Sequence, residues 1–278
     1  MKRKLFGVVA AVALTAALAF TGCGGNGGSA ESDDPLADGI LKIGTNATYV
    51  PLEYRDEETN EMVGFDIDLG NALAEELGVK SEWVDTSFDG IFNGLNAKQY
   101  DAIIAGVSIT PDRSEAFNMS SPYISNGIVI VSRNDETPGK TAEDLRGKRV
   151  GVQIETTADI AAQSFIDKDG IDMDLQKFDG MLDAFTALEG KSLDYVVTDK
   201  PVGQFYTGLK PDVYSVTSDI LSNEPIGITM RKDDTEFAKK MEETLQKLRD
   251  NGKLAELSQK WFKEDVTQNI DTELKVIE

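Results

Sequence analysis

Short apolar runs and longer amphipathic stretches take turns along residues 41–113, which predicts strands and helices in alternation. Between the first two runs, Leu69, Leu73 and Leu77 recur every four residues, as on the buried face of a helix, and Gly78 follows where that helix would end. The runs with the length of strands are 41–44, 82–84 and 101–105. This alternation favours a mostly parallel sheet with helices on its faces.

Two more helix starts lie in the same part of the chain. Ser87 is a capping residue before a helix that carries Ile91 and Leu95. Thr110 and Pro111 predict another start, because proline is favoured in the first turn of a helix.

Residues 148–197 repeat the plan. Runs at 148–152 and 195–197 predict strands, Thr156 or Thr157 is the expected cap of one helix, and residues 181–185 lie on another. The segment 95–101 before one predicted strand also resembles the segment 188–194 before another. The two cycles therefore indicate two lobes of similar plan.

Two extended apolar runs, 128–131 and 227–230, lie where the chain would pass between the lobes. They predict a two-stranded hinge, with its pivots near residues 125–127 and 225–227. After the second crossing, apolar residues recur at helical spacing, which indicates two amphipathic helices packed on the first lobe. Those residues are Phe237, Met241, Leu245, Leu248, Leu254, Leu257 and Trp261.

The first 23 residues have the order of a bacterial lipoprotein signal. Three basic residues precede an uncharged apolar run from Leu5 to Phe20, which is short for a membrane span, and Cys23 follows. We expect residues 1–22 to be a signal peptide, Cys23 to carry a lipid, and residues 23–38, rich in Gly, Ser and acid, to be a flexible tether. The alternative is a plain secretory signal in which Cys23 occurs by chance.

Composition excludes several classes of function. Without residues 1–22 the chain keeps 25 basic and 49 acidic residues, a net charge of −24, which argues against a nucleic-acid partner. Its 278 residues include no histidine, which excludes His-based triads and His-ligated zinc. Cys23 is the single cysteine and is expected to be lipidated, so we expect no metal, no cofactor and no thiol catalysis.

Four polar residues at the ends of predicted strands suggest a ligand site. Ligands of open α/β sheets bind beyond the carboxyl ends of the strands. Arg113 and the hydroxyls of Ser108 and Thr157 suit a carboxylate, and Asp199 suits an ammonium group. Together they predict capture of a free α-amino acid.

The chain from about residue 41 to residue 262 resembles the bacterial extracellular solute-binding proteins of family 3, the polar-amino-acid receptors of ABC importers. The resemblance rests on the order and spacing of several modest motifs. They are residues 64–69 (GFDIDL), 87–91 (SFDGI), 101–113, 117–123 (FNMSSPY) and 261–262 (WF). It implies an α/β fold of the periplasmic-binding-protein type, with two lobes, each a mostly parallel sheet flanked by helices, joined by a two-stranded hinge.

Site roles follow from the same resemblance. It implies that Arg113 and Thr157 hold the ligand carboxylate, that Ser108 reaches the main-chain groups of the ligand, and that Asp199 takes its ammonium group. The remaining implied contacts are the aromatic Tyr49 and Phe88, which sandwich the ligand side chain, and the backbone of Ala105 and Gly106.

Two positions depart from the family pattern. Asn46 stands where several cation-binding members carry Asp, which weakens an assignment to lysine or arginine. Glu155 stands where Gly is common, and it either faces solvent at the rim or forms an acidic wall of the pocket. Gln153 beside it is a candidate hydrogen-bond partner for a polar ligand side chain.

The predicted organisation and partners complete this interpretation. The expected segments are a signal peptide (1–22), a tether (23–38), the first part of lobe 1 (39–125), lobe 2 (126–226), the return to lobe 1 (227–270) and a tail (271–278). We expect a monomer, not an enzyme, that is held at the extracytoplasmic face of the membrane by lipid on Cys23 and serves ABC permease subunits. Two alternatives stay open: a cyclohexadienyl dehydratase-like enzyme with Glu155 as its acid, and an amino-acid sensory module.

Cys23→Ser is expected to release the protein from membranes and to leave its ligand affinity unchanged. A lipid anchor acts only through partitioning, at about 0.8 kcal/mol per buried CH₂ group. Membrane fractionation together with a binding titration checks this, and a Ser variant found wholly in the membrane fraction would contradict lipidation of Cys23.

Overall fold

The structure, a computed structural model, describes residues 34–277. The predicted signal peptide, Cys23 and positions 23–33 of the predicted tether lie outside this range. The last part of the tether is not the flexible linker that was expected, because residues 34–39 form hydrogen-bonded turns and Leu36 is buried in a hydrophobic cluster. Within residues 34–277, no helix is both long and apolar enough to cross a bilayer.

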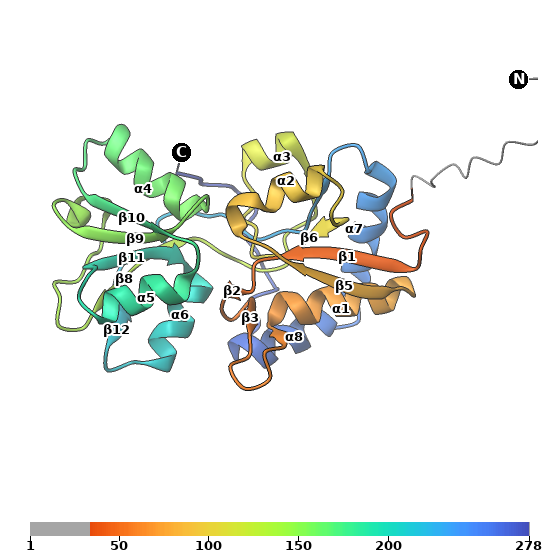
Figure 1. Ribbon diagram of the computed structural model, residues 1–278, viewed down its shortest axis with the longest axis horizontal. Coiled ribbons are helices and arrows are strands. Elements are labelled where there is room, and N and C mark those ends of the chain that lie inside the picture. Colours follow the sequence, from red (N-terminus) through yellow and green to blue (C-terminus); the bar gives the residue numbers. More distant parts are fainter. Residues whose placement is uncertain (1–33, 278) are drawn as a thin grey trace, which may run out of the picture. The chain divides into compact units, whose positions relative to one another are not determined.

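Five strands form the first sheet (Figure 1). In spatial order they are β5 (Lys80–Asp85), β1 (Ile40–Thr45), β6 (Ala102–Ile103), β13 (Thr229–Arg231) and β7 (Phe117–Met119). β1 runs parallel to β5 and β6, whereas β13 runs antiparallel to β6 and β7. The sheet is therefore mixed, because the chain re-enters it through β13 after leaving the second sheet.

Helices cover both faces of this sheet. They are α1 (Phe65–Leu77), the 3-10 turn η1 (Phe88–Gly90), α2 (Ile91–Asn96), α3 (Pro111–Ala116), α7 (Thr235–Asp250) and α8 (Lys253–Phe262). α1 packs on β1 and β5 and contacts α7 and α8, and α2 lies on the other face (Figure 1). Residues 102–105 form a continuous apolar run because both faces are covered: Ala102 and Ile104 join one buried cluster, Ile103 and Ala105 another.

Of the helix boundaries that the sequence predicted around the first sheet, some are confirmed and one is wrong. α1 is confirmed, with Leu69 and Leu73 fully buried and Gly78 in the left-handed conformation (φ 71°) that ends the helix. The cap predicted at Ser87 is absent, since its side chain makes no capping bond and α2 begins only after η1.

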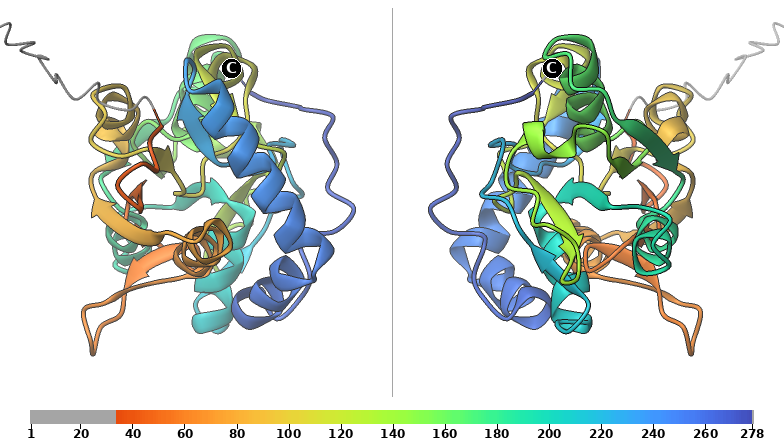
Figure 2. Two further views of the ribbon diagram at one scale, coloured as in Figure 1. Left: turned by 90° about the vertical axis from the view of Figure 1, so that its right-hand side faces the viewer. Right: turned by 90° about the vertical axis from the view of Figure 1, so that its left-hand side faces the viewer.

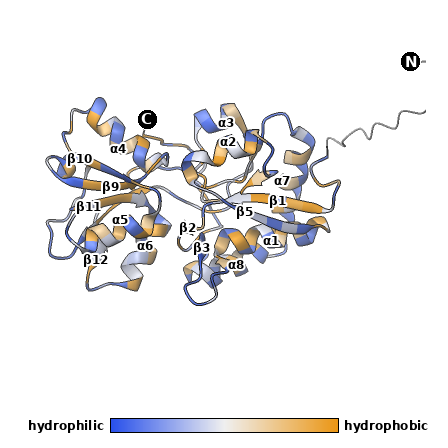
Figure 3. Cartoon of the chain, in the orientation of Figure 1, coloured by the Kyte–Doolittle hydropathy of each residue, from blue (hydrophilic) through white to orange (hydrophobic). Residues whose placement is uncertain are grey.

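A second mixed sheet has its own five strands. In spatial order they are β10 (Asp174–Phe178), β9 (Arg149–Gln153), β11 (Tyr195–Asp199), β8 (Ile128–Arg133) and β12 (Tyr214–Val216). Its helices are the 3-10 helix η2 (Ala142–Leu145), α4 (Thr157–Asp167), α5 (Met181–Glu189) and α6 (Lys200–Leu209). β9 pairs in parallel with β10 and β11, and β8 pairs antiparallel with β11 and β12. Hydrophobic residues dominate β1 and β11, the inner strands of the two sheets (Figure 3).

Two segments join the sheets, residues 120–127 and 217–228, and they pair with each other. The N–H of Tyr123 donates to the oxygen of Ile226 (2.9 Å), and the N–H of Ile226 donates to Ile124 (3.1 Å). The runs 128–131 and 227–230 were predicted to be this crossing. The first belongs to β8 and the second leads into β13, so the crossing itself is the less regular chain before each run.

Residues 263–277 add a third segment beside the crossing, although residues 271–278 were expected only to be a tail. Ser125 donates its N–H to Val266 (3.1 Å), and Asn223 and Lys275 exchange two backbone hydrogen bonds of 2.9 and 3.0 Å. Ile277 then packs on the α4 side of the second sheet. Figure 2 shows this dark blue segment running back from α8.

Two glycines, one in a crowded strand and one in an open part of a helix, provide a test of packing. An added Cβ at Gly44 in β1 would lie 2.5 Å from the ring of Tyr100, whereas Gly208 in α6 has open space around it. We expect Gly44→Ala to lower the free energy of unfolding by about 1–3 kcal/mol. Gly208→Ala should raise it by up to about 1 kcal/mol, because alanine is the better helix former. Urea titration checks both, and equal midpoints for the two variants would contradict the packing described for β1.

Candidate functional site

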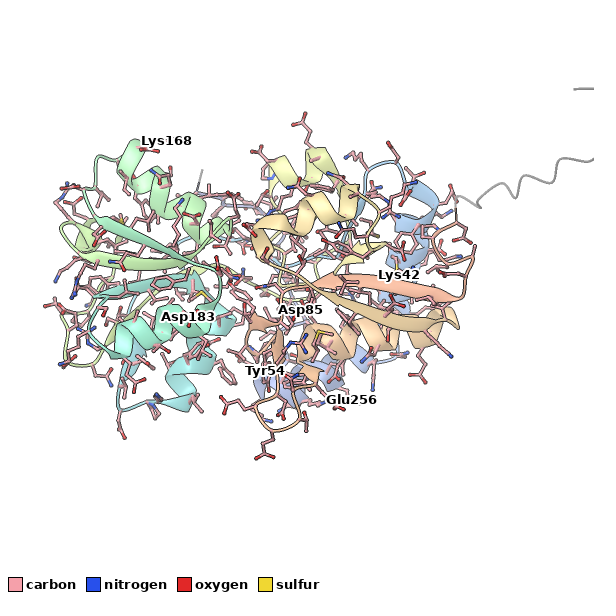
Figure 4. The ribbon with its side chains drawn as sticks, viewed as in Figure 1. Lys42, Tyr54, Asp85, Lys168, Asp183 and Glu256 are labelled. Atoms are coloured by element: carbon pink, nitrogen blue, oxygen red, sulfur yellow. The ribbon has the colours of Figure 1, made fainter. Side chains whose placement is uncertain are left out.

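A small cavity lies where the carboxyl ends of strands from both sheets meet. Figure 4 labels Asp85 at this end of β5 and Lys42 near the opposite end of β1. The lining of the cavity contains nine predicted site residues together with Thr156. They are Tyr49, Phe88, Ala105, Gly106, Ser108, Arg113, Gln153, Thr157 and Asp199.

Arg113 enters the cavity from the first turn of α3. Thr110 caps this helix by accepting the N–H of Arg113 (3.2 Å), and Pro111 fits its first turn, as predicted. The guanidinium group donates from Nη1 to the backbone oxygen of Ser108 (2.9 Å) and lies 5.9 Å from the ring centre of Phe88. Burial lowers the pKa of Arg113 and nearby carboxyls oppose that shift, so the group remains a cation.

Thr157 is free to face the cavity because Thr156 caps α4. The hydroxyl of Thr156 accepts the N–H of Asp159 (3.3 Å), which decides between the two threonines that the sequence left open as the cap. Thr157 is then the first helical residue, and its hydroxyl lies 3.4 Å from that of Ser108. Two hydroxyls and a guanidinium group therefore converge at one end of the cavity.

Asp199 lines the same cavity from the point where β11 stops and α6 begins. It makes no side-chain cap to α6, and its Oδ2 instead accepts the hydroxyl of Tyr49 (2.8 Å). Burial raises the pKa of Asp199, and the neighbouring Asn126 amide, Tyr49 and Arg113 oppose the increase. Its Oδ1 receives no fully formed hydrogen bond from residues 34–277, so a cation in the cavity would satisfy it.

Asn46 does not line the cavity but holds Gln153, which does. The Nδ2 group of Asn46 donates to the backbone of Thr86 (2.8 Å), which turns its Oδ1 toward Gln153. The Nε2 group of Gln153 donates to this oxygen (2.8 Å) and to the backbone oxygen of Asp179 (2.9 Å). Both amide hydrogens of Gln153 are thus used, and its Oε1 is left as an acceptor.

Glu155 does not form an acidic wall of the pocket. The residue is exposed and absent from the cavity lining, and its positive φ of 62° is one that glycine adopts more easily. Only its backbone reaches the site, because Glu155 O lies 3.5 Å from Nη2 of Arg113. Of the two interpretations of Glu155, solvent exposure at the rim is the one that holds.

A buried pair of carboxyls supports the cavity at Gly106. Asp66, at the start of α1, accepts the N–H of Gly106 (2.7 Å) and the hydroxyl of Tyr123 (2.9 Å) on Oδ2. The carboxyl of Glu53, also fully buried, lies near enough to Asp66 for the negative charge of Asp66 to raise its pKa beyond the effect of burial. Burial raises the pKa of Asp66 to about 7 and that of Glu53 well above its ordinary value.

Sequence reasoning missed the polar residues behind the cavity. Asn126 donates to Ser108 Oγ (3.3 Å), and Glu224 lies fully buried in the second segment between the sheets. Residues 64–69 were noted as a motif, but nothing in their pattern reveals that Asp66 is buried. The positions of Asn126 and Glu224 depend on the pairing of two distant segments, so no local signal identifies them.

The arrangement can receive a zwitterion, because a cation and an anion, Arg113 and Asp199, line the same small cavity. Residues of the second sheet supply Gln153, Thr157 and Asp199, and the rest of the chain supplies Tyr49, Ser108 and Arg113, so both sides must contribute. Within residues 34–277 no group of three acidic side chains is placed to hold a metal ion.

The sequence profile of the bacterial extracellular solute-binding proteins, family 3, matches residues 41–264. The L-cystine-binding protein TcyJ of Escherichia coli is 28% identical over 231 residues, which cover 83% of this chain and 85% of that protein. The ABC transporter arginine-binding protein 1 of the same organism is 30% identical over 226 residues, or 80% and 90% of the two chains.

A solved structure is similar over the same region. It is the ancestral amino acid-binding protein AncCDT-1, described as a precursor of cyclohexadienyl dehydratase. It aligns with a TM-score of 0.74 and 36% identity over 81% of this chain and 96% of its own. The two-lobe α/β fold predicted from the sequence is therefore confirmed.

The buried carboxyl of Asp66 predicts a pH dependence of stability. Its native pKa of about 7 exceeds the value of about 3.9 expected in the unfolded chain, so the native state binds the extra proton between these values. The free energy of unfolding should then fall as the pH rises from about 4 to about 8. Asp66→Asn should weaken this dependence, and Asp183→Asn on the exposed face of α5 should not. Thermal melts across that range check this, and identical slopes for the two variants would contradict it.

Proposed function

Because the chain belongs to the bacterial extracellular solute-binding proteins of family 3, we propose that it captures a free polar L-amino acid and delivers it to the permease subunits of an ABC importer. The observation that carries this proposal is the pairing of Arg113 with Asp199 across one small cavity between the two sheets. An α-amino acid has the matching carboxylate and ammonium groups, whereas a singly charged solute would leave one protein charge unmatched.

The two charged groups of the cavity, Arg113 and Asp199, support different contacts with the ligand. Arg113 and the hydroxyls of Ser108 and Thr157 offer charged and neutral donors to a carboxylate. Asp199 offers the acceptor Oδ1 to an ammonium group, while Tyr49 holds its other oxygen. This assignment extends the roles inferred from the sequence to the residues that line the cavity together.

The side chain of the ligand is expected to carry a hydrogen-bond donor. Oε1 is the free polar atom of Gln153, because its amide hydrogens are already held by Asn46 and Asp179. Tyr49 and Phe88 contribute aromatic surface to the same cavity. Amide, guanidinium and ammonium side chains meet this requirement, and acidic side chains do not. The neutral Asn46 gives no reason to choose a cationic ligand over an uncharged one.

Delivery requires access to a membrane transporter. Lipid on Cys23 would hold the protein at the extracytoplasmic face, where it would work as a monomer, since one chain supplies both sides of the cavity. Ligand binding would favour the closed arrangement of the lobes, because only this arrangement brings both sets of contacts to one small molecule. Residues 125–127 and 225–227 are the proposed pivots.

The dehydratase alternative loses its candidate acid. Glu155 was the one residue offered for that chemistry, and its side chain is exposed and outside the cavity lining. The sensory alternative involves the same binding step and differs only in the partner that receives the closed protein.

Substitution of the two charged anchors tests the proposed function. We expect Arg113→Ala and Asp199→Ala each to weaken amino-acid binding by about 3–5 kcal/mol, several hundredfold or more, because each leaves a buried ligand charge unmatched. Asp112→Ala is the matched control, since Asp112 is exposed in the same helical turn as Arg113. Calorimetric titration with the twenty L-amino acids identifies the ligand of the parent protein and measures each loss.

Two results would contradict the proposal. One is the absence of binding by any amino acid to the folded parent. The other is a similar loss in Asp112→Ala, which would make the effect one of overall charge and not of specific contacts.

A further inference from the structure

Glu224 is a carboxyl that the proposed ligand contacts leave unused. It lies in the segment that returns from the second sheet, it is 0% exposed, and its N–H donates to Asn126 on the other crossing segment (3.1 Å). Neither carboxyl oxygen receives a fully formed hydrogen bond from residues 34–277. A buried carboxyl in such a place is costly unless a nearby cation or a proton compensates it.

Arg113 is a cation near enough to Glu224 to lower its pKa. Ile226, two residues further along, forms a β-bridge with Ser108, and Pro225 accepts the N–H of Ile109 (2.8 Å), so this segment lies directly against the chain that leads into α3. The carboxyl therefore lies behind the cavity, on the side of the guanidinium group and not in the lining itself.

The other groups around Glu224 come from three elements. The hydroxyl of Thr157 from α4 and that of Ser222 from the same crossing segment lie near the carboxyl, and Asp199 at the end of β11 adds a second negative charge. Burial raises the pKa of Glu224 most and Asp199 raises it further, while Thr157, Ser222 and Arg113 lower it. Arg113 and Thr157 are also the groups assigned above to the ligand carboxylate.

We propose that Glu224 is a functional residue of this site, an internal carboxyl that balances Arg113 until the carboxylate of an amino acid takes over that role. The inference rests on the proposed function, because it requires a ligand carboxylate at Arg113. Glu224 is a positioning residue in this scheme: it acts on the ligand through Arg113 and Thr157 and makes no contact of its own.

A proton must accompany the exchange. When a ligand carboxylate reaches Arg113, two carboxylates compete for one guanidinium group, and the ionised form of Glu224 becomes less favourable. Glu224 then takes one proton from solvent, so that the charge beside Arg113 is the same before and after binding. The ligand carboxylate stays ionised because it is the one in contact with Arg113 and the two hydroxyls.

The sign of the pH dependence follows from this uptake. Binding raises the pKa of Glu224, so affinity is greatest where Glu224 is already protonated in the free protein. Affinity then falls by up to about tenfold per pH unit, until the pH exceeds the pKa that Glu224 has in the complex. A site without such a group would bind a zwitterion equally well across the neutral range.

Calorimetry measures the proton directly. The probe is the amino acid that binds the parent protein most tightly in the titration of twenty, with L-arginine and L-glutamine tried first. Titration in phosphate and in Tris at the same pH separates the heat of proton uptake from the heat of binding, since the two buffers differ in ionisation enthalpy. We expect the parent protein to take up close to one proton per ligand at pH values between the pKa of Glu224 in the free protein and its higher pKa in the complex.

Glu224→Gln keeps the shape and removes the titration. This variant should take up no proton, should bind with the same affinity from about pH 6 to about pH 8, where the ligand keeps its own ammonium proton, and should bind at least tenfold more tightly than the parent at the upper end. Glu224→Asp should keep the pH dependence. A matched control, the exposed Glu155→Gln, should take up protons as the parent does.

The outcomes separate the two proposals. Binding without proton uptake by the parent, or equal uptake by the parent and Glu224→Gln, would overturn the role of Glu224 and leave the proposed function in place. Loss of uptake in Asp66→Asn and not in Glu224→Gln would overturn it as well, by assigning the proton to the other buried carboxyl. Failure of all twenty amino acids to bind would overturn the proposed function and this inference with it. The measurement on the parent needs no variant, so a Glu224→Gln protein that fails to fold leaves a decisive test.

Discussion

Opposite charges that line one small cavity, Arg113 and Asp199, constrain the architecture around them. A charged group in such surroundings needs partners in fixed positions, because solvent does not rearrange to stabilise it. The strand ends and helix starts of two separate sheets provide these positions. Thr110 and Thr156 do this indirectly: by capping α3 and α4, they leave Arg113 and Thr157 to face the cavity.

Contacts between the two sides of the cavity also provide polar groups with partners in fixed positions. Tyr49 donates to Asp199, and the Gln153 amide donates to Asn46, so polar groups that would otherwise lie unsatisfied at the boundary satisfy each other. Beneath the cavity, Asp66 accepts the N–H of Gly106 and so satisfies another polar group. The φ of 60° at Gly106 lets the backbone turn close to Tyr49. Burial raises the pKa of the Asp66 and Asp199 carboxyls, and their hydrogen-bond partners oppose this, which links the site to pH.

The sequence predicted most of the elements that build this site, because their signals are local. The spacing of Leu69, Leu73 and Leu77 with Gly78 indicates α1, and Thr110-Pro111 indicates α3. The sequence did not predict that each sheet mixes parallel and antiparallel strands. In the first sheet, for example, β13 pairs with β6 only after the chain has built the second sheet. Asn126 and Glu224 escaped notice for a similar reason: two ordinary polar residues become part of the site only when segments about a hundred positions apart run side by side.

The placement of β13 also bears on how the protein folds. The strands of the second sheet all lie within residues 128–216, whereas the first sheet contains β13, where Thr229 pairs with Ile103. Contacts between distant parts of a chain form more slowly than local ones, because a longer loop must close first. The second sheet would then be complete while the first still lacks a central strand.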